Sequence, residues 1–170
     1  DADTIRRALG GTLPPAILVK AVEEVPPGFH ARYDARERSY EYLFITRPTA
    51  LWRGRTYNAG GPLDVGAMRA ALRPLIGEHD FASFAAAGCA ARTTRCRVIR
   101  ANVSTPGPLV VLELTADRFL HNMVRILAGT LLDAGRGKPV DTAAILDARD
   151  REAAGPTLPP RALYLVEVRY

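Results

Sequence analysis

The 170-residue sequence is poor in cysteine and histidine, with two of the first and three of the second. Six residues lie between Cys89 and Cys96, which is neither a zinc-knuckle nor a redox spacing. His30, His79 and His121 lie far apart in the chain. We therefore expect no metal site. Two thiols without a signal-like segment at the start favour a reducing, cytoplasmic location.

Long apolar runs and familiar catalytic motifs are also missing. No run approaches the ~20 apolar residues that a membrane-spanning helix needs. The sequence has no P-loop, no G-x-G-x-x-G segment and no Ser/His/Asp or Cys/His arrangement at a recognisable spacing. These absences argue against a membrane protein and leave no catalytic group that the residues alone identify.

The composition is that of an ordinary soluble domain, with 48% hydrophobic and 24% charged residues. A chain of this length buries enough surface to fold as one domain over residues 1–170 without disulfides or a structural metal. However, the sequence has no initiator Met, and its first residues, DADTIRRALG, have the pattern of the middle of a helix. We therefore expect the chain to be part of a longer protein.

Basic residues outnumber acidic ones by 23 to 18, which gives a net charge of +5. Lys20 and Lys138 are the only lysines, so all the other basic residues are arginine. Guanidinium groups suit phosphate binding and base stacking because they are planar, always charged and offer paired donors. The balance favours a polyanionic partner. Codon bias in a genome rich in Ala and Gly codons explains the arginines equally well.

Hydrophobic periodicity predicts an α+β fold with a largely antiparallel sheet. In SYEYLFIT, Tyr40 and Tyr42 share one strand face with Phe44. Asp64 and Asp141 are suitable N-caps for two helices. The predicted strands are 17–25, 39–46, 97–104, 108–116 and 163–170, and the predicted helices are 64–75, 117–135 and 141–149.

The predicted helix 117–135 separates an apolar side from a polar stripe that holds Arg118, His121, Asn122 and Arg125. Gly129 lies one turn beyond Arg125, where the missing side chain leaves room for another backbone or a ligand. The stripe fits a binding surface. A solvated face of a surface helix has the same pattern.

Two further groups of residues are candidates for RNA contact. Tyr40 and Tyr42 could form a stacking platform for a base, although core packing is the commoner role of such tyrosines. Arg38 precedes their strand, and Arg92 and Arg95 lie in the segment ARTTRCR. Each basic group could bind phosphate or could be a solvated loop.

Five segments of the chain, in order, resemble the C-terminal, larger half of the tRNA pseudouridine synthase A family. They are FHARYDARERSYEY (29–42), GEHDFASF (77–84), ARTTR (91–95), FLHNMVRILAGTLLDAG (119–135) and AGPTLPPRALYLVEVRY (154–170). The resemblance covers essentially the whole chain. It implies the pseudouridine-synthase fold, an α+β fold whose antiparallel sheet carries helices on one face.

The resemblance implies a function as well. The family isomerises uridine to pseudouridine in the anticodon stem-loop of tRNA without a cofactor, using an Asp, a Tyr stacked on the target base and an Arg that pairs with the Asp. By matching segments, Tyr40 corresponds to the Tyr and Arg125 to the Arg. Arg38, Arg92, Arg95, Arg118 and His121 become possible tRNA contacts, and family members are homodimers.

The family's Asp lies in a G-R-T-D-x-G-V-H-like segment, and the 170 residues contain nothing of that form. We therefore expect this Asp to precede the chain, and the isolated chain to be inactive as an enzyme. Two alternatives remain: a standalone, non-catalytic tRNA-binding domain, and a basic domain that pairs only with protein.

Overall fold

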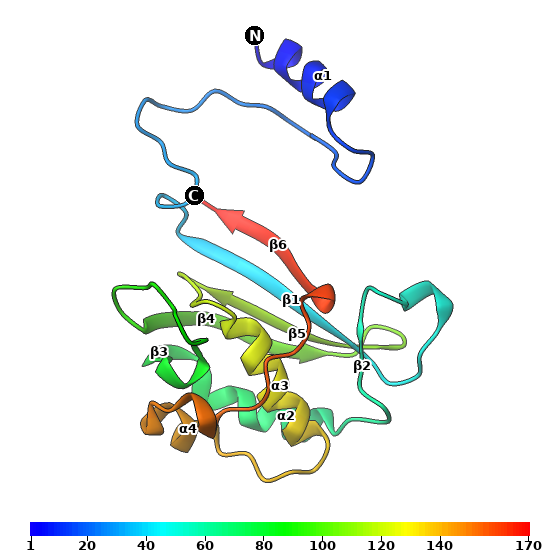
Figure 1. Cartoon of the computed structure of the whole chain (residues 1–170), viewed down its shortest axis with the longest axis vertical. Helices are drawn as coiled ribbons and strands as arrows, with labels where there is room; N and C mark the ends of the chain where they lie inside the picture. The colour runs from blue at the N-terminus through cyan, green and yellow to red at the C-terminus, as the bar shows by residue number, and fades with distance from the viewer. The chain divides into compact units, whose positions relative to one another are not determined.

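A computed structural model describes residues 1–170 as two compact units, Asp1–Asp34 and Ala35–Tyr170 (Figure 1). The first unit holds helix α1 (Ala2–Thr12), as the opening residues indicated. Asp1 caps this helix, because its carboxylate accepts a hydrogen bond of 2.7 Å from the backbone N–H of Thr4.

The predicted strand 17–25 is wrong, since these residues have no regular secondary structure. Ile17 is 55% exposed and Leu18 80% exposed. A strand is stable only when its backbone groups pair with a neighbour and one of its faces is buried. The first unit contains no strand, so the backbone of this segment has no strand to pair with in its unit.

The second unit is built on a six-stranded sheet with the order β2-β1-β5-β4-β3, and β6 also pairs with β1. All its pairings are antiparallel except that of β1 with β2, which confirms the largely antiparallel prediction. The strands are β1 (Glu37–Ile45), β2 (Tyr57–Asn58), β3 (Gly77–Asp80), β4 (Arg95–Ser104), β5 (Leu109–Ala116) and β6 (Leu163–Arg169).

Three helices lie together on one face of this sheet in Figure 1, which confirms the predicted α+β fold. They are α2 (Val65–Leu72), α3 (Met123–Gly135) and α4 (Thr142–Ala148). The predicted caps are confirmed: Asp64 accepts from the N–H of Ala67, and Asp141 accepts from two N–H groups of α4. No helix combines the length and apolar character that crossing a membrane requires.

The main core lies between this sheet and its helices. On β1 Tyr42 and Phe44 share one face, as the period-two pattern of the strand predicted, and both side chains are completely buried. They pack in one cluster with the apolar residues of α3, which include Ile126 and Leu127. The core therefore fixes the position of α3 relative to β1, and these two elements carry the candidate site.

The predicted helix 117–135 begins only at Met123, so the polar stripe does not form one helical face. Asp117 accepts a hydrogen bond from the N–H of Arg97 on the neighbouring strand, at 2.9 Å. Asn122 has left-handed backbone geometry with φ 61°. These two residues hold the intervening loop, whose Leu120 is nevertheless buried in the core. The apolar residues of this loop therefore continue the helical pattern of α3 in the sequence, although the loop itself is not helical.

Candidate functional site

Arg125 lies in the first turn of α3 and is half-buried. Its Nε donates to the carbonyl oxygen of Leu158 at 2.5 Å, and its Nη1 donates to Oδ1 of Asn122 at 2.7 Å. None of the ion pairs in the structure includes Arg125. Two neutral oxygens therefore hold the guanidinium in place, and its positive charge stays uncompensated within the chain.

Tyr42 on β1 lies beside this arginine. Its buried hydroxyl donates to the carbonyl oxygen of Pro159 at 2.9 Å, one residue beyond the carbonyl that Arg125 uses. Burial raises the pKa of the Tyr42 hydroxyl well above its usual range, while the positive charges of Arg125 and Arg161 act in the opposite direction. The Tyr42 hydroxyl therefore stays protonated and serves as a fixed donor.

Tyr40 lies two residues before Tyr42, on the same face of β1. Side chains at i and i+2 of a strand are separated by about 7 Å. The Tyr40 ring therefore lies next to Tyr42, which is the neighbour of Arg125. It is partly exposed and packs at the margin of the core. Phe119 meets it edge to face, with ring centroids 5.2 Å apart. This contact fixes the ring while leaving part of it accessible.

Close approach between backbones keeps the Leu158 carbonyl near Arg125. A Cβ atom on Gly129 would lie 1.9 Å from the carbonyl oxygen of Pro156, so only glycine fits there. The neighbouring Thr130 hydroxyl accepts from the N–H of Gly155 at 2.9 Å. The missing side chain at Gly129 thus admits another backbone segment, as one of the two sequence-based interpretations proposed.

Arg38 and Arg118 lie at the end of the sheet where β1 starts and β5 finishes. Arg38 donates to the carbonyl oxygen of Asp117 at 2.6 Å. Arg118 donates to the carbonyl oxygen of Thr93 at 2.8 Å and also to that of Arg95. Both guanidiniums thus fasten loops at this end of the sheet. The contact of Arg38 and Arg118 with tRNA stays a prediction.

The three other predicted RNA contacts are exposed. Arg92 lies in the loop before β4, and Arg95 begins that strand, where it forms an ion pair of 3.0 Å with Glu78. His121 lies in the loop before α3, and its carbonyl oxygen accepts from the N–H of Ala86. The bonds from Arg118 to the Thr93 and Arg95 carbonyls thus bring the basic residues of two separate segments together where β4 begins.

Sequence reasoning missed the acceptors that position Arg125. The carbonyl of Leu158 belongs to the backbone, so no side-chain pattern marks it. Asn122 was expected on the same helical face as Arg125, whereas it precedes the helix and still contacts the guanidinium. The structure has no group of three or more His, Cys, Asp or Glu side chains placed to hold a metal ion.

Sequence comparisons match this chain to enzymes that modify tRNA. A tRNA pseudouridine synthase family model matches residues 71–170. The proteins named tRNA pseudouridine synthase A from Caldicellulosiruptor bescii, Bordetella parapertussis and Bacillus velezensis are 44%, 45% and 43% identical to it, over 99%, 96% and 96% of the chain. The aligned region spans 70%, 62% and 68% of those relatives. The chain belongs to the tRNA pseudouridine synthase family.

Proposed function

We propose that this chain is the larger, C-terminal part of a tRNA pseudouridine synthase A, which isomerises uridine to pseudouridine in tRNA. The reaction breaks the glycosidic bond and rejoins the ribose to C5 of the same base, so it needs no cofactor. The observation that carries this proposal is the uncompensated, fixed guanidinium of Arg125 on the same side of the sheet as Tyr40.

Arg125 is suited to hold a catalytic carboxylate. Its bonds to the Leu158 carbonyl and the Asn122 amide use Nε and Nη1, which leaves Nη2 for a further acceptor. An Asp placed there would gain a charge-assisted hydrogen bond in a half-buried setting, and the guanidinium would keep that Asp ionised. The fixed geometry of Arg125 would then place the carboxylate for attack or proton transfer at the target nucleotide.

Tyr40 is suited to contact the target base. A uridine must leave its stack before an enzyme reaches the glycosidic bond, and an aromatic ring replaces part of the lost stacking. The edge-to-face contact with Phe119 fixes the Tyr40 ring, and its partial exposure leaves a surface for a base. We propose that the ring forms one wall of the uridine site.

No Asp of this chain lies in a segment of the G-R-T-D form that the family uses. Asp117 accepts from the N–H of Arg97, and Asp80 accepts from the N–H of Ala82, so both have structural roles. We propose that the catalytic Asp is supplied from outside this chain and that the isolated chain is inactive. We further propose an anticodon stem-loop substrate, a homodimeric enzyme and a cytoplasmic location.

Pseudouridine formation on an unmodified tRNA transcript tests this proposal. We propose that the reading frame continues upstream of Asp1 and encodes a longer protein, which supplies the comparison. We expect that protein to contain a G-R-T-D-like segment and to modify the anticodon stem-loop, while the 170-residue chain forms no product. A start codon near Asp1 and binding without modification would instead favour the standalone tRNA-binding domain. Product formed by the isolated chain would show that another carboxylate acts.

A further inference from the structure

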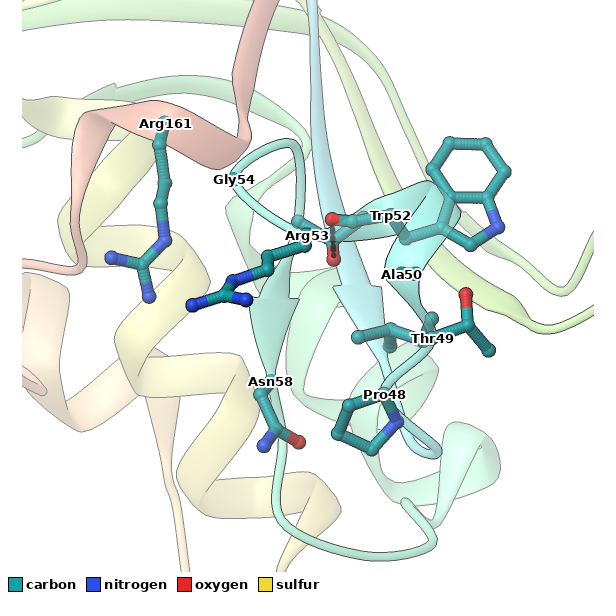
Figure 2. A pocket seen from close by; sticks show the side chains of 10 residues that line it. Pro48, Thr49, Ala50, Trp52, Arg53, Gly54, Asn58 and Arg161 are labelled. Carbon is teal, nitrogen blue, oxygen red and sulfur yellow. Dashed lines mark hydrogen bonds between the residues drawn. The ribbon is translucent and has the colours of Figure 1, made fainter.

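A pocket of about 690 Å³ lies beside the candidate site, between the loop that joins β1 to β2 and the segment before β6 (Figure 2). Its volume falls within the range typical of small-ligand sites. The residues that line it are Ile45, Pro48, Thr49, Ala50, Trp52, Arg53, Gly54, Thr56, Asn58 and Arg161. None of them carries a negative charge, and two carry a positive one.

The two arginines of this pocket come from distant parts of the sequence. Arg53 follows the short helical turn Ala50–Trp52, and Arg161 belongs to the turn Pro160–Ala162. Figure 2 shows both guanidinium groups directed to the same side of the pocket. Neither side chain forms a hydrogen bond or an ion pair in the structure. Two like charges that share a pocket without a carboxylate form an electrostatic site for an anion.

Acidic residues are absent from the surrounding sequence as well. Residues 46–63 contain three arginines, Arg47, Arg53 and Arg55, and no Asp or Glu. Residues 153–166 contain Arg161 and again no Asp or Glu. Neither segment therefore supplies a carboxylate of its own to neutralise this positive charge.

The pocket wall is a fixed part of the fold. Trp52 points away from Arg53 in Figure 2 and packs against the small cluster of Ile45, Leu109 and Val111. The buried Thr56 hydroxyl donates to the Trp52 carbonyl at 3.1 Å. These contacts hold the loop on the sheet before any ligand binds.

A second contact joins this loop to the other side of the pocket. The Tyr164 hydroxyl on β6 donates to the carbonyl oxygen of Arg55 at 2.8 Å. Arg161 lies three residues before Tyr164, so this bond restrains the separation between the two halves of the pocket. The site is thus preorganised, which lowers the entropic cost of binding.

The pocket adjoins the site built around Arg125. Arg161 lies three residues after Leu158, whose carbonyl holds the Arg125 guanidinium. The charges of Arg125 and Arg161 both act on the Tyr42 hydroxyl, where each opposes the rise in pKa that burial causes. A nucleotide chain that places a uridine at Tyr40 and Arg125 would therefore pass close to this pocket.

From this geometry we propose that Arg53 and Arg161 together bind one backbone phosphate of the tRNA strand next to the target uridine. The inference rests on the proposed function and adds a substrate-positioning site to it. Guanidinium groups bind phosphate through paired N–H donors, so two of them form a clamp with defined geometry. This contact would fix the strand while Tyr40 and Arg125 act on the base and the ribose.

Salt-dependent binding of an unmodified tRNA transcript to the 170-residue chain tests the clamp. We expect Arg53→Ala and Arg161→Ala each to weaken binding roughly tenfold at moderate salt. The double variant should lower the slope of log K against log salt by about 1, because one phosphate contact is lost. Arg53→Lys with Arg161→Lys keeps both charges and should keep the slope.

Arg73→Ala is the matched control, since Arg73 is exposed, lies away from the pocket and forms no side-chain bond. A double variant that binds like this control, with an unchanged slope, would overturn the clamp but leave the proposed function intact. A wild-type chain without salt-dependent tRNA binding would contradict both. Unchanged melting temperatures of all variants would show that the effects on binding do not come from unfolding.

Discussion

Substitution of Gly129 by alanine should disturb the site from a distance. The added Cβ would lie 1.9 Å from the carbonyl oxygen of Pro156, whereas ordinary contact needs at least 3.4 Å. The segment around Pro156 must therefore move by about 1.5 Å. The backbone of residue 129 fixes the position of the new Cβ, and its clash partner is a backbone oxygen, so no side-chain rotation relieves the clash.

The loss in the free energy of unfolding follows from the hydrogen bonds that such a shift strains. The N–H of Gly155 donates to Thr130, and the carbonyl of Leu158 accepts from Arg125. Each hydrogen bond contributes about 1 kcal/mol net, and overpacking costs about 1–3 kcal/mol. Alanine returns up to about 1 kcal/mol through its higher helix propensity. We expect a net loss of about 2–4 kcal/mol in the free energy of unfolding.

Urea and thermal unfolding of the 170-residue chain measure this loss. For a chain of this size it corresponds to a fall in Tm of about 4–16 °C. In the longer enzyme, displacement of Arg125 by about 1 Å should lower kcat roughly 100-fold. The matched control is Gly135→Ala on the same helix, where the new Cβ meets the flexible Met68 side chain at 3.0 Å. Equal stability of the two variants would refute the reasoning.

Three further variants follow from the described contacts. Arg118→Ala removes bonds to backbone carbonyls and should cost about 1–2 kcal/mol in urea unfolding; no change would mean that water replaces them. The pKa of Asp80 is lowered from 3.8, chiefly by a hydrogen bond from the Thr94 hydroxyl, so this carboxylate stabilises the fold above pH 3.8 and loses that effect as the pH falls further. Asp80→Asn should therefore be less stable than wild type at neutral pH, and the difference should shrink in acid denaturation curves; a constant difference would contradict this. Tyr40→Ala in the longer enzyme should slow pseudouridine formation more than Tyr40→Phe does, and an unaffected rate would assign Tyr40 to core packing beside Phe119.

Local patterns predicted the parts of the fold that depend on nearby residues. The alternation in β1 placed Tyr42 and Phe44 on one face of the strand, and Asp64 and Asp141 identified the starts of two helices. Periodicity succeeds in such cases because residues that are close in the sequence of a helix or strand are also close in space.

The errors have a common physical origin in non-local contacts. The loop before α3 is held by a hydrogen bond from Arg97 on another strand to Asp117, which no local pattern encodes. Residues 17–25 have a strand pattern but no strand to pair with in their unit. In both cases the tertiary partner, present or missing, decided the conformation of the segment.

The candidate site shows the same limit. Family resemblance singled out Arg125 and Tyr40, which periodicity alone did not separate from a solvated charge and a core residue. The backbone carbonyl that holds Arg125 belongs to Leu158, more than 30 positions later in the sequence, so only the fold reveals it. The pocket of Arg53 and Arg161 likewise joins two segments that carry no recognisable motif.

The role of Arg125 as the partner of a catalytic carboxylate is tested most directly by Arg125→Met in the longer enzyme. Single-turnover pseudouridine formation and tRNA affinity are measured on the same variant. We predict that turnover is lost by a factor of at least ~10³, because a preorganised charge at the reacting groups is removed, while the Kd for tRNA changes only a few-fold. Equal losses in rate and affinity would contradict this role and make Arg125 an ordinary phosphate contact.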